Sequence, residues 1–317
     1  MSSTAHPSAA QVARGLWLGL LGVTIFALTL PMTRLAVGDS SAPQLPPSFV
    51  TFGRAAVAGA LSLLYLAWQY QRQRLVVPRA REWALLGFTA LGVVLGFPLG
   101  LAMALREVPS THAAVVTGLL PLATACVAAV WMRQRPSLPF WLLSLLGTAL
   151  VLGFMAWRAG GLHLSQADGW LLLAMASASL GYVGGARLTP RLGAEQVICW
   201  ILVLTLPLTA PLSLWFQPED ASRIGAASWA AFAYVAVFSM WLGFFAWYRG
   251  LALGGAVRVS QVQLLQPFLS LVFAVPLLGE RLDAVTLAFG LGVMLTVLLG
   301  RRTAVRNRPA ARHPGDA

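Results

Sequence analysis

The sequence predicts an all-α polytopic membrane protein with ten transmembrane helices, arranged as two inverted five-helix repeats. The first reason is composition: 58% of the residues are hydrophobic, only 10% are charged, and the mean hydropathy is +0.75. Soluble domains carry about 25% charged residues. The second is that apolar runs of about 20 residues, long enough to cross ~30 Å of hydrocarbon, recur along the whole chain. The third is an internal similarity at an offset of 146 residues, nearly half of the 317-residue chain.

Ten apolar runs define the predicted helices. Short loops that contain Pro, Gly, Ser or charged residues separate them. The runs cover residues 14–36, 48–70, 82–104, 109–132, 138–157, 168–186, 194–216, 228–248, 256–278 and 283–300. The first run is too long for the apolar core of a signal peptide, which spans about 7–15 residues. We expect a first repeat of five helices over residues 14–157, a second over 168–300, and a basic cytoplasmic tail over 301–317.

The arginines predict the orientation of these helices. All 22 basic residues are arginine, and Arg54 alone lies away from the ends of a predicted helix. With the N-terminus in the cytoplasm, 16 arginines fall in cytoplasmic segments and five fall outside. This excess predicts that both termini are cytoplasmic. Because five is an odd number, the second half enters the membrane from the opposite side, and such inverted repeats are typical of secondary transporters.

The net charge of +12 is scattered over short loops, which indicates membrane orientation rather than nucleic-acid binding. The expected partners are therefore a small-molecule substrate and the lipid bilayer, with no nucleic acid; a monomer and a homodimer both stay open. The chain has no lysine for a phosphate-binding loop, and it lacks motifs for a metal site or a catalytic nucleophile. We expect no enzyme activity, no cofactor and no metal.

Two prolines near the middle of apolar runs, Pro121 and Pro267, are related by the offset of 146 residues. A proline inside a helix frees the carbonyl four residues earlier, here that of Thr117 or Gln263. In lipid such groups must face protein or a water-filled cavity. One such helix is readily explained as a packing kink, but the pair favours a substrate site at the midplane. The substrate-binding candidates of this pair are Thr117, Pro121, Ser260, Gln263, Gln266 and Pro267.

Five single residues are further candidates for substrate binding. Arg54 is a functional candidate because an intramembrane charge is expensive, although it lies near the outer end of its helix and could extend to the interface. Trp241 is the one tryptophan near the midplane and would either line a cavity or pack in the core. Thr24 and Thr29 in the first predicted helix and Tyr182 in the sixth are weaker candidates.

Ion coupling has no obvious residue in this sequence. No Asp or Glu lies deep inside a predicted helix. If transport is coupled to protons, the proton must bind to His112, to an acid at a helix end such as Glu107 or Glu280, or to the substrate itself.

Two ladders of small residues are predicted to let helices approach closely. Each places a small side chain at every fourth position of an apolar run. The first is Gly92, Gly96 and Gly100, and the second is Ser177, Gly181 and Gly185.

Three segments carry a resemblance to a known family. They are TFGRAAVAGAL (residues 51–61), ALREVPSTHAAVVTGLLPLATACVAAVWMRQR (104–135) and GLALGGAVRVSQVQLLQPFLSLVFAVPLLGERL (250–282). The last is the strongest: a small-residue start, a mid-helix proline after a glutamine, and then Gly-Glu-Arg. Over residues 14–300 the chain resembles the drug/metabolite transporter superfamily, in its ten-helix branch made of two EamA domains. The first half departs from the pattern, with Arg-Gln-Arg at 133–135 in place of Gly-Glu-Arg.

The resemblance implies ten helices, cytoplasmic termini and a central cavity between the repeats. It also implies export of amino acids, other metabolites or toxic compounds by secondary transport in the bacterial inner membrane. The positions it carries over are Arg54, Pro121, Pro267, Gly279, Glu280 and Arg281.

Our leading hypothesis is a secondary transporter that exports a small metabolite such as an amino acid by alternating access. A multidrug exporter of apolar cations is the alternative, but it needs an acidic group in its cavity. A lipid scramblase, an intramembrane enzyme and a structural or receptor subunit are the remaining classes.

Overall fold

The computed structural model describes residues 9–131, 137–158, 165–254, 262 and 265–303. Within these residues the chain is helical apart from turns, loops and one isolated β-bridge between Gly38 and Pro43. Six helical segments are long and apolar enough to cross a membrane: Ala10–Val37, Pro47–Gln71, Ala80–Glu107, Gln166–Leu192, Glu195–Trp215 and Ala226–Trp247. Shorter apolar helices cover Trp141–Trp157, Gln266–Leu278 and Ala284–Thr296. The predicted all-α polytopic fold is confirmed.

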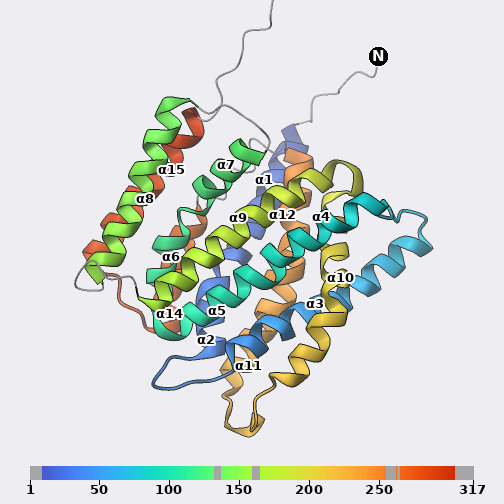
Figure 1. Cartoon of the computed structure of the whole chain (residues 1–317), viewed down its shortest axis with the longest axis horizontal. Coiled ribbons are helices and arrows are strands. Elements are labelled where there is room, and N and C mark those ends of the chain that lie inside the picture. Colours follow the sequence, from blue (N-terminus) through green and yellow to red (C-terminus); the bar gives the residue numbers. More distant parts are fainter. Residues whose placement is uncertain (1–8, 132–136, 159–164, 255–261, 263–264, 304–317) are drawn as a thin grey trace, which may run out of the picture.

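The helices fall into two sets of similar design (Figure 1). The first set is α1 (Ala9–Ala27), α2 (Thr29–Val37), α3 (Pro47–Gln71), α4 (Ala80–Ala90), the π-helical segment η1 (Leu91–Gly96), α5 (Phe97–Glu107), α6 (Ser110–Thr117), α7 (Leu120–Trp131) and α8 (Leu138–Arg158). The second set is α9 (Gln166–Leu192), α10 (Ala194–Trp215), the short 3₁₀ turn η2 (Ala221–Arg223), α11 (Ala226–Tyr234), the π-helical segment η3 (Val235–Leu242), α12 (Gly243–Gly254), α14 (Gln266–Leu278) and α15 (Ala284–Thr303).

The helix boundaries reproduce the predicted repeat. Adding the offset of 146 residues to the first residues of α4, α7 and α8 gives the first residues of α11, α14 and α15. The same shift places η1 at residues 237–242, inside η3. These paired π-helical segments were not predicted; a π turn interrupts the regular i→i−4 ladder and is frequent at functional sites. The fold therefore consists of two inverted five-helix repeats.

Helix packing follows the same relation. Helix α1 packs along α12, and its equivalent α9 packs along the span formed by α4, η1 and α5. The remaining large contacts join equivalent helices, α3 with α10 and α8 with α15. The α8–α15 pair lies at one side of the molecule in Figure 1. Each large contact thus has a symmetry mate or joins the two halves across the pseudo-twofold axis.

The positions of the terminal helices and of two loops define the two ends of the helix bundle. In Figure 1, α1 begins and α15 ends at the same end of the bundle, and the loops that precede α3 and α11 lie at the opposite end. We call the first the inner end and the second the outer end, after the predicted orientation. Helix α15 extends to Thr303, three residues into the predicted tail.

The first membrane span is broken between α1 and α2, and Pro31 accounts for the break. Proline has no N–H to donate to the carbonyl four residues earlier, which belongs to Ala27. The Ser270 hydroxyl of α14 donates to the Ala27 carbonyl oxygen instead, at 2.8 Å. A side chain of the second repeat therefore satisfies a carbonyl that the first repeat leaves free.

The two predicted ladders of small residues face each other. A Cβ atom added to Gly92 would overlap the Ser177 carbonyl oxygen and lie 2.9 Å from the Gly181 Cα. One added to Gly96 would lie 2.5 Å from the Ser177 hydroxyl oxygen. The third and sixth spans therefore touch backbone to backbone, and the predicted packing role is confirmed.

Candidate functional site

A buried polar cluster joins the two repeats in the interior of the bundle. Arg54 of α3 is only 3% exposed, and its Nη2 donates to the Ser239 hydroxyl oxygen of η3 at 3.0 Å. The Ser239 hydroxyl lies 2.8 Å from the Thr29 hydroxyl at the start of α2. We call Thr29, Arg54 and Ser239 the central cluster. Arg54 does not extend to the interface, because its guanidinium is hydrogen-bonded inside the bundle.

The charge of Arg54 has no counter-ion among the residues that the structure describes. The arginines that form ion pairs in this part of the chain are Arg34, Arg191, Arg223 and Arg249. The Nε of Arg54 is buried and makes no hydrogen bond there either. Tyr182 of α9 lies close enough to interact with it electrostatically. A buried cation is costly unless it is paired. The cluster is therefore chemically suited to bind an anionic group such as a carboxylate.

Trp241 and Thr24 lie outside the hydrogen bonds of this cluster. Trp241 belongs to η3, as Ser239 does, and packs on Phe245 with a ring-centroid distance of 4.8 Å. Its indole N–H is buried and has no hydrogen-bond partner in the described part of the chain. Thr24 is half-buried on α1. Of the five single candidates, the structure places Arg54 and Thr29 in the central cluster and brings Tyr182 close to Arg54.

The two central prolines stand at equivalent helix starts. Helix α7 begins at Leu120 and α14 begins at Gln266, so the proline is the second residue in both. Thr117 is the last residue of α6, and its hydroxyl donates to the Ala113 carbonyl oxygen at 2.7 Å. Gln266 and Pro267 are half-buried. Ser260, Gln263 and the side chain of Pro121 lie outside the described residues.

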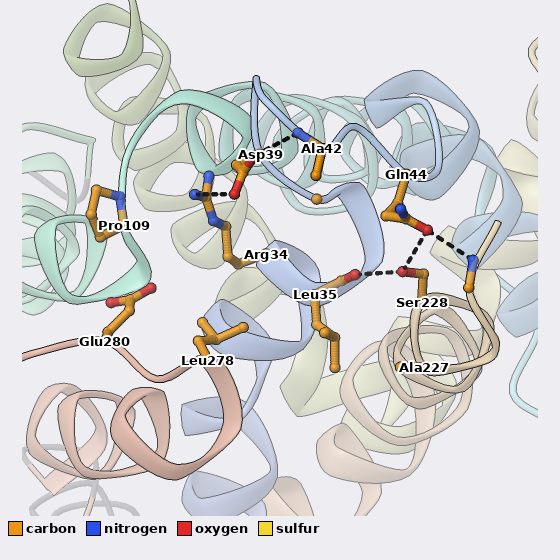
Figure 2. A pocket seen from close by; sticks show the side chains of 12 residues that line it. Arg34, Leu35, Asp39, Ala42, Gln44, Pro109, Ala227, Ser228, Leu278 and Glu280 are labelled. Atoms are coloured by element: carbon orange, nitrogen blue, oxygen red, sulfur yellow. Dashed lines mark hydrogen bonds and ion pairs between the residues drawn. The ribbon is translucent and has the colours of Figure 1, made fainter. Parts of the chain in front are cut away.

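A cavity of about 440 Å³ opens at the outer end, between the first turn of α6, the loop after α2 and the start of α11 (Figure 2). On one wall, the Gln44 side-chain oxygen accepts from the Gly225 N–H at 2.8 Å. The Ser228 hydroxyl donates to the Leu35 carbonyl oxygen at 2.8 Å. These bonds join the outer ends of the two repeats.

The other wall of this cavity is charged. Arg34 donates to the Leu105 carbonyl oxygen, and its Nη2 lies 3.7 Å from Asp39 Oδ2. Asp39 accepts from the Ser41 hydroxyl and from the Ala42 N–H, and these bonds hold the pKa of its carboxyl below the usual range. In Figure 2 the Arg34 guanidinium points toward Asp39, and Glu280 lies beside Pro109. The cavity therefore carries charges of both signs. The sequence did not predict it.

The coupling candidates meet at the first turn of α6, except for Glu107, which is exposed at the end of α5. The Glu280 side chain accepts from the Ser110 N–H at 2.7 Å and from the Thr111 N–H at 2.8 Å. His112 is buried, with its Nε2 2.8 Å from Asp168 Oδ1 at the start of α9. Both contacts connect the first repeat to the second.

Asp168 was not predicted as a site residue from the sequence. It stands at the predicted start of a helix, where an acid is usually a solvent-exposed cap. It completes the capping box of α9, because its Oδ2 accepts from the N–H and hydroxyl of the N-cap Ser165, but it is only 2% exposed. No sequence pattern shows that its second oxygen faces His112.

Comparison with known proteins agrees with this architecture. The model of the EamA-like transporter family matches residues 13–156 and again residues 165–300. A Bacillus subtilis protein described as "Uncharacterized transporter YdeK" is 44% identical over 287 residues, which cover 90% of this chain and 96% of the relative. A "Probable terminal-alkyne amino-acid exporter" of Streptantibioticus cattleyicolor is 24% identical, over 95% of this chain and 98% of the relative.

A solved crystal structure that is 20% identical superposes with a TM-score of 0.60, over 93% of this chain and 99% of that one, and it supports the fold alone. The two family matches fall on the two five-helix sets, and the 44% identity spans nearly all of both chains. The chain is therefore a member of the EamA-like transporter family, in the drug/metabolite transporter superfamily.

Proposed function

We propose that this transporter exports a small metabolite that carries a carboxylate, such as an amino acid, across a bacterial inner membrane by alternating access. In this proposal both termini lie in the cytoplasm. The observation that carries the proposal is the buried guanidinium of Arg54, which has no carboxylate partner in the described part of the chain. The printed name of one relative, an amino-acid exporter, supports the same substrate class.

The central cluster suits a carboxylate by geometry as well as by charge. A guanidinium presents parallel N–H groups that can bind both oxygens of a carboxylate. The Ser239 and Thr29 hydroxyls add two groups that can donate or accept. Binding an anion would offset the cost of the buried charge, so the empty and loaded states of the site would differ in stability. A difference of this kind is what a transporter needs to couple substrate binding to a change of conformation.

The same cluster weighs against a multidrug exporter of cations. A cationic drug in the interior would meet the like charge of Arg54, and like charges in a desolvated site repel strongly. The fully buried acid in the described residues, Asp168, is engaged at the outer end by Ser165 and His112.

Alternating access is supported by the paired elements of the two repeats. Helices α7 and α14 begin at equivalent prolines, and η1 and η3 interrupt equivalent spans. In secondary transporters, broken helices at the repeat interface line the substrate site. We propose that Thr117, Pro121, Gln266 and Pro267 flank the route to the central cluster. Ser260 and Gln263, predicted for the same site, lie outside the described residues.

A transport panel tests this function. Purified protein is reconstituted in liposomes, and counterflow is measured with amino acids, other carboxylates and organic amines of similar size. We expect at least one carboxylate-bearing compound to be exchanged and simple amines to be excluded. Exchange of amines alone would contradict the proposed substrate class, and protein-free liposomes are the control.

A further inference from the structure

Asp39, in the wall of the outer cavity, uses only one of its carboxylate oxygens to hold its own loop. Its Oδ1 accepts from the Ser41 N–H and hydroxyl and from the Ala42 N–H. Its Oδ2 accepts no hydrogen bond within the part of the chain that the structure describes, and it lies 3.7 Å from Arg34 Nη2. The second oxygen is therefore not needed for the loop and remains as a free acceptor beside Arg34.

Arg34 is divided in the same way. Its Nη1 donates to the Leu105 carbonyl oxygen, which fixes the guanidinium against the end of α5. Its Nη2 and Nε donate to no other described residue, because the 3.7 Å between Nη2 and Asp39 Oδ2 exceeds the N···O distance of a hydrogen bond, about 2.7–3.2 Å. The Arg34 side chain is only 17% exposed, so it is largely withdrawn from bulk water. Two opposite charges thus stand side by side without a hydrogen bond between them.

An α-amino acid presents the complementary pair of charges. Its ammonium and its carboxylate are attached to the same carbon atom, so they also lie side by side. The carboxylate can accept from the spare N–H groups of Arg34, and the ammonium can donate to Asp39 Oδ2. A simple anion bound to Arg34 would meet the like charge of Asp39, and a simple cation bound to Asp39 would meet that of Arg34. The pair therefore suits a zwitterion best.

The rest of the cavity provides room and an apolar surface (Figure 2). Its volume of about 440 Å³ falls within the range of small-molecule sites, about 300–1,000 Å³. Leu35 and Leu278 line it and are both half-buried. The other apolar residues in its wall are Ala42, Pro109 and Ala227. An apolar side chain of moderate size fits such a surface.

Glu280 sets the balance of charge in the cavity. Its two oxygens are already engaged by the backbone N–H groups of Ser110 and Thr111. It lies close enough to Arg34 to interact electrostatically. With Asp39 it gives the cavity two carboxylates against one guanidinium. This excess of negative charge favours a ligand that carries an ammonium over one that carries a carboxylate alone.

The inverted repeat does not require the charged pair. At the offset of 146 residues, Arg34 and Asp39 correspond to Leu180 and Gly185, and neither of these is charged. The pair is therefore specific to the first repeat and does not follow from the shared fold.

We infer that the outer cavity is a second substrate site, which binds the zwitterionic head group of an apolar α-amino acid. Arg34 binds the carboxylate and Asp39 binds the ammonium. The inference rests on the proposed export function, because it makes this cavity the last site that the substrate occupies before release. It also narrows the substrate class from a carboxylate to a zwitterion.

Protection of a cysteine in the cavity wall tests this site. Ala42 is exposed and lines the cavity. Ala42→Cys is introduced into the full-length protein together with Arg54→Met, which disables the central cluster, and alkylation by N-ethylmaleimide in detergent is timed with and without L-leucine. We expect L-leucine at saturation to slow the alkylation at least about fivefold, because only unoccupied protein reacts freely. Protein without Ala42→Cys gives the background from Cys126, which is half-buried, and Cys199, which is buried.

Two relatives of L-leucine test the head group. L-leucinamide keeps the ammonium and lacks the carboxylate, whereas 4-methylpentanoate keeps the carboxylate and lacks the ammonium. Each loses one charged hydrogen-bonding partner, so each should need at least an about tenfold higher concentration than L-leucine for half-protection.

Asp39→Asn tests the acidic partner and has a matched control. The asparagine oxygen can still accept from Ser41, so the loop should keep its shape while the charge is lost. We expect half-protection by L-leucine to need at least an about tenfold higher concentration. Asp220 accepts from the N–H and hydroxyl of Ser222 as Asp39 does from Ser41, but it lies outside the residues that line the cavity. Asp220→Asn should therefore leave the protection unchanged.

Three results would overturn the outer site: no protection by L-leucine, equal protection in Asp39→Asn, or equal protection by 4-methylpentanoate. The comparison of the three ligands needs no change at Asp39, so it decides the question if Asp39→Asn does not fold. If the wild type transports no carboxylate, the proposed function fails, and the protection of Ala42→Cys still decides whether the cavity binds a zwitterion.

Discussion

Replacing Arg54 with methionine is expected to lower carboxylate transport by about 30-fold or more, while leaving the protein folded. Losing one partner of a buried charged hydrogen bond to a ligand costs about 2–5 kcal/mol, which corresponds to this range. Arg54→Lys keeps the charge but loses the planar fork, so it should retain more transport than Arg54→Met. The measurement is the initial rate of counterflow at a substrate concentration well below saturation.

The effect of Arg54→Met on protein stability distinguishes substrate binding by Arg54 from a structural role. In the described residues Arg54 has no counter-ion, so removing its charge should be neutral or stabilising, as it often is when buried charges are replaced by apolar groups. We expect Arg54→Met to melt at or above the wild-type temperature in detergent. The control is Arg223→Gln, which removes an exposed arginine at the outer end. Loss of both folding and transport would show that Arg54 holds the bundle together instead, and full transport would exclude it from the substrate site.

Gly92→Ala is expected to destabilise the protein markedly, whereas Gly87→Ala, in the same membrane span, is not. Alanine favours the helix by about 1 kcal/mol at both positions. At Gly87 an added Cβ meets nothing within 4 Å, but at Gly92 it overlaps the backbone of α9 at Ser177 and Gly181. Overpacking of this kind typically costs about 1–3 kcal/mol. Backbone atoms cannot turn aside as a flexible side chain can, so the upper part of this range is expected.

Thermal unfolding in one detergent compares the two glycine variants. The difference between them is more informative than either value, because the gain in helix propensity is common to both. Equal melting temperatures would mean that the third and sixth spans are not in backbone contact.

Much of the fold could be predicted because membrane helices are constrained by length. Runs of about 20 apolar residues must cross the bilayer, and the arginines between them indicate the side. The repeat was visible because Pro121 and Pro267 lie at equivalent positions, and both mark the start of a helix in the structure. The two ladders of small residues were visible because their spacing of four residues follows the helical period.

The partners of the functional side chains could not be predicted in the same way. Arg54 was found because a charge inside an apolar run is conspicuous. Ser239 was missed and Thr29 was only a weak candidate, because a hydroxyl in an apolar run is common and the helix rotation that turns it toward Arg54 depends on tertiary packing. No local sequence pattern marks the π-helical segment that contains Ser239.

The outer end was the least predictable region. Glu280 was noticed as part of a Gly-Glu-Arg turn, but its bonds to Ser110 and Thr111 join residues 170 and 169 positions apart. The same is true of His112 and Asp168, which are 56 positions apart. Contacts of this range follow from the assembly of the two repeats and not from any local pattern.

The most direct test of the central claim is a comparison of an amino acid with its α-amide in counterflow. The two molecules share side chain, size and ammonium group, and differ in the charge that Arg54 is proposed to bind. The amino acid is chosen as one that the wild type exchanges. We predict that the acid competes for transport and that the amide does not, even at a concentration 100-fold higher, which is about 2.7 kcal/mol of discrimination. Equal competition by the amide would contradict a carboxylate site at Arg54.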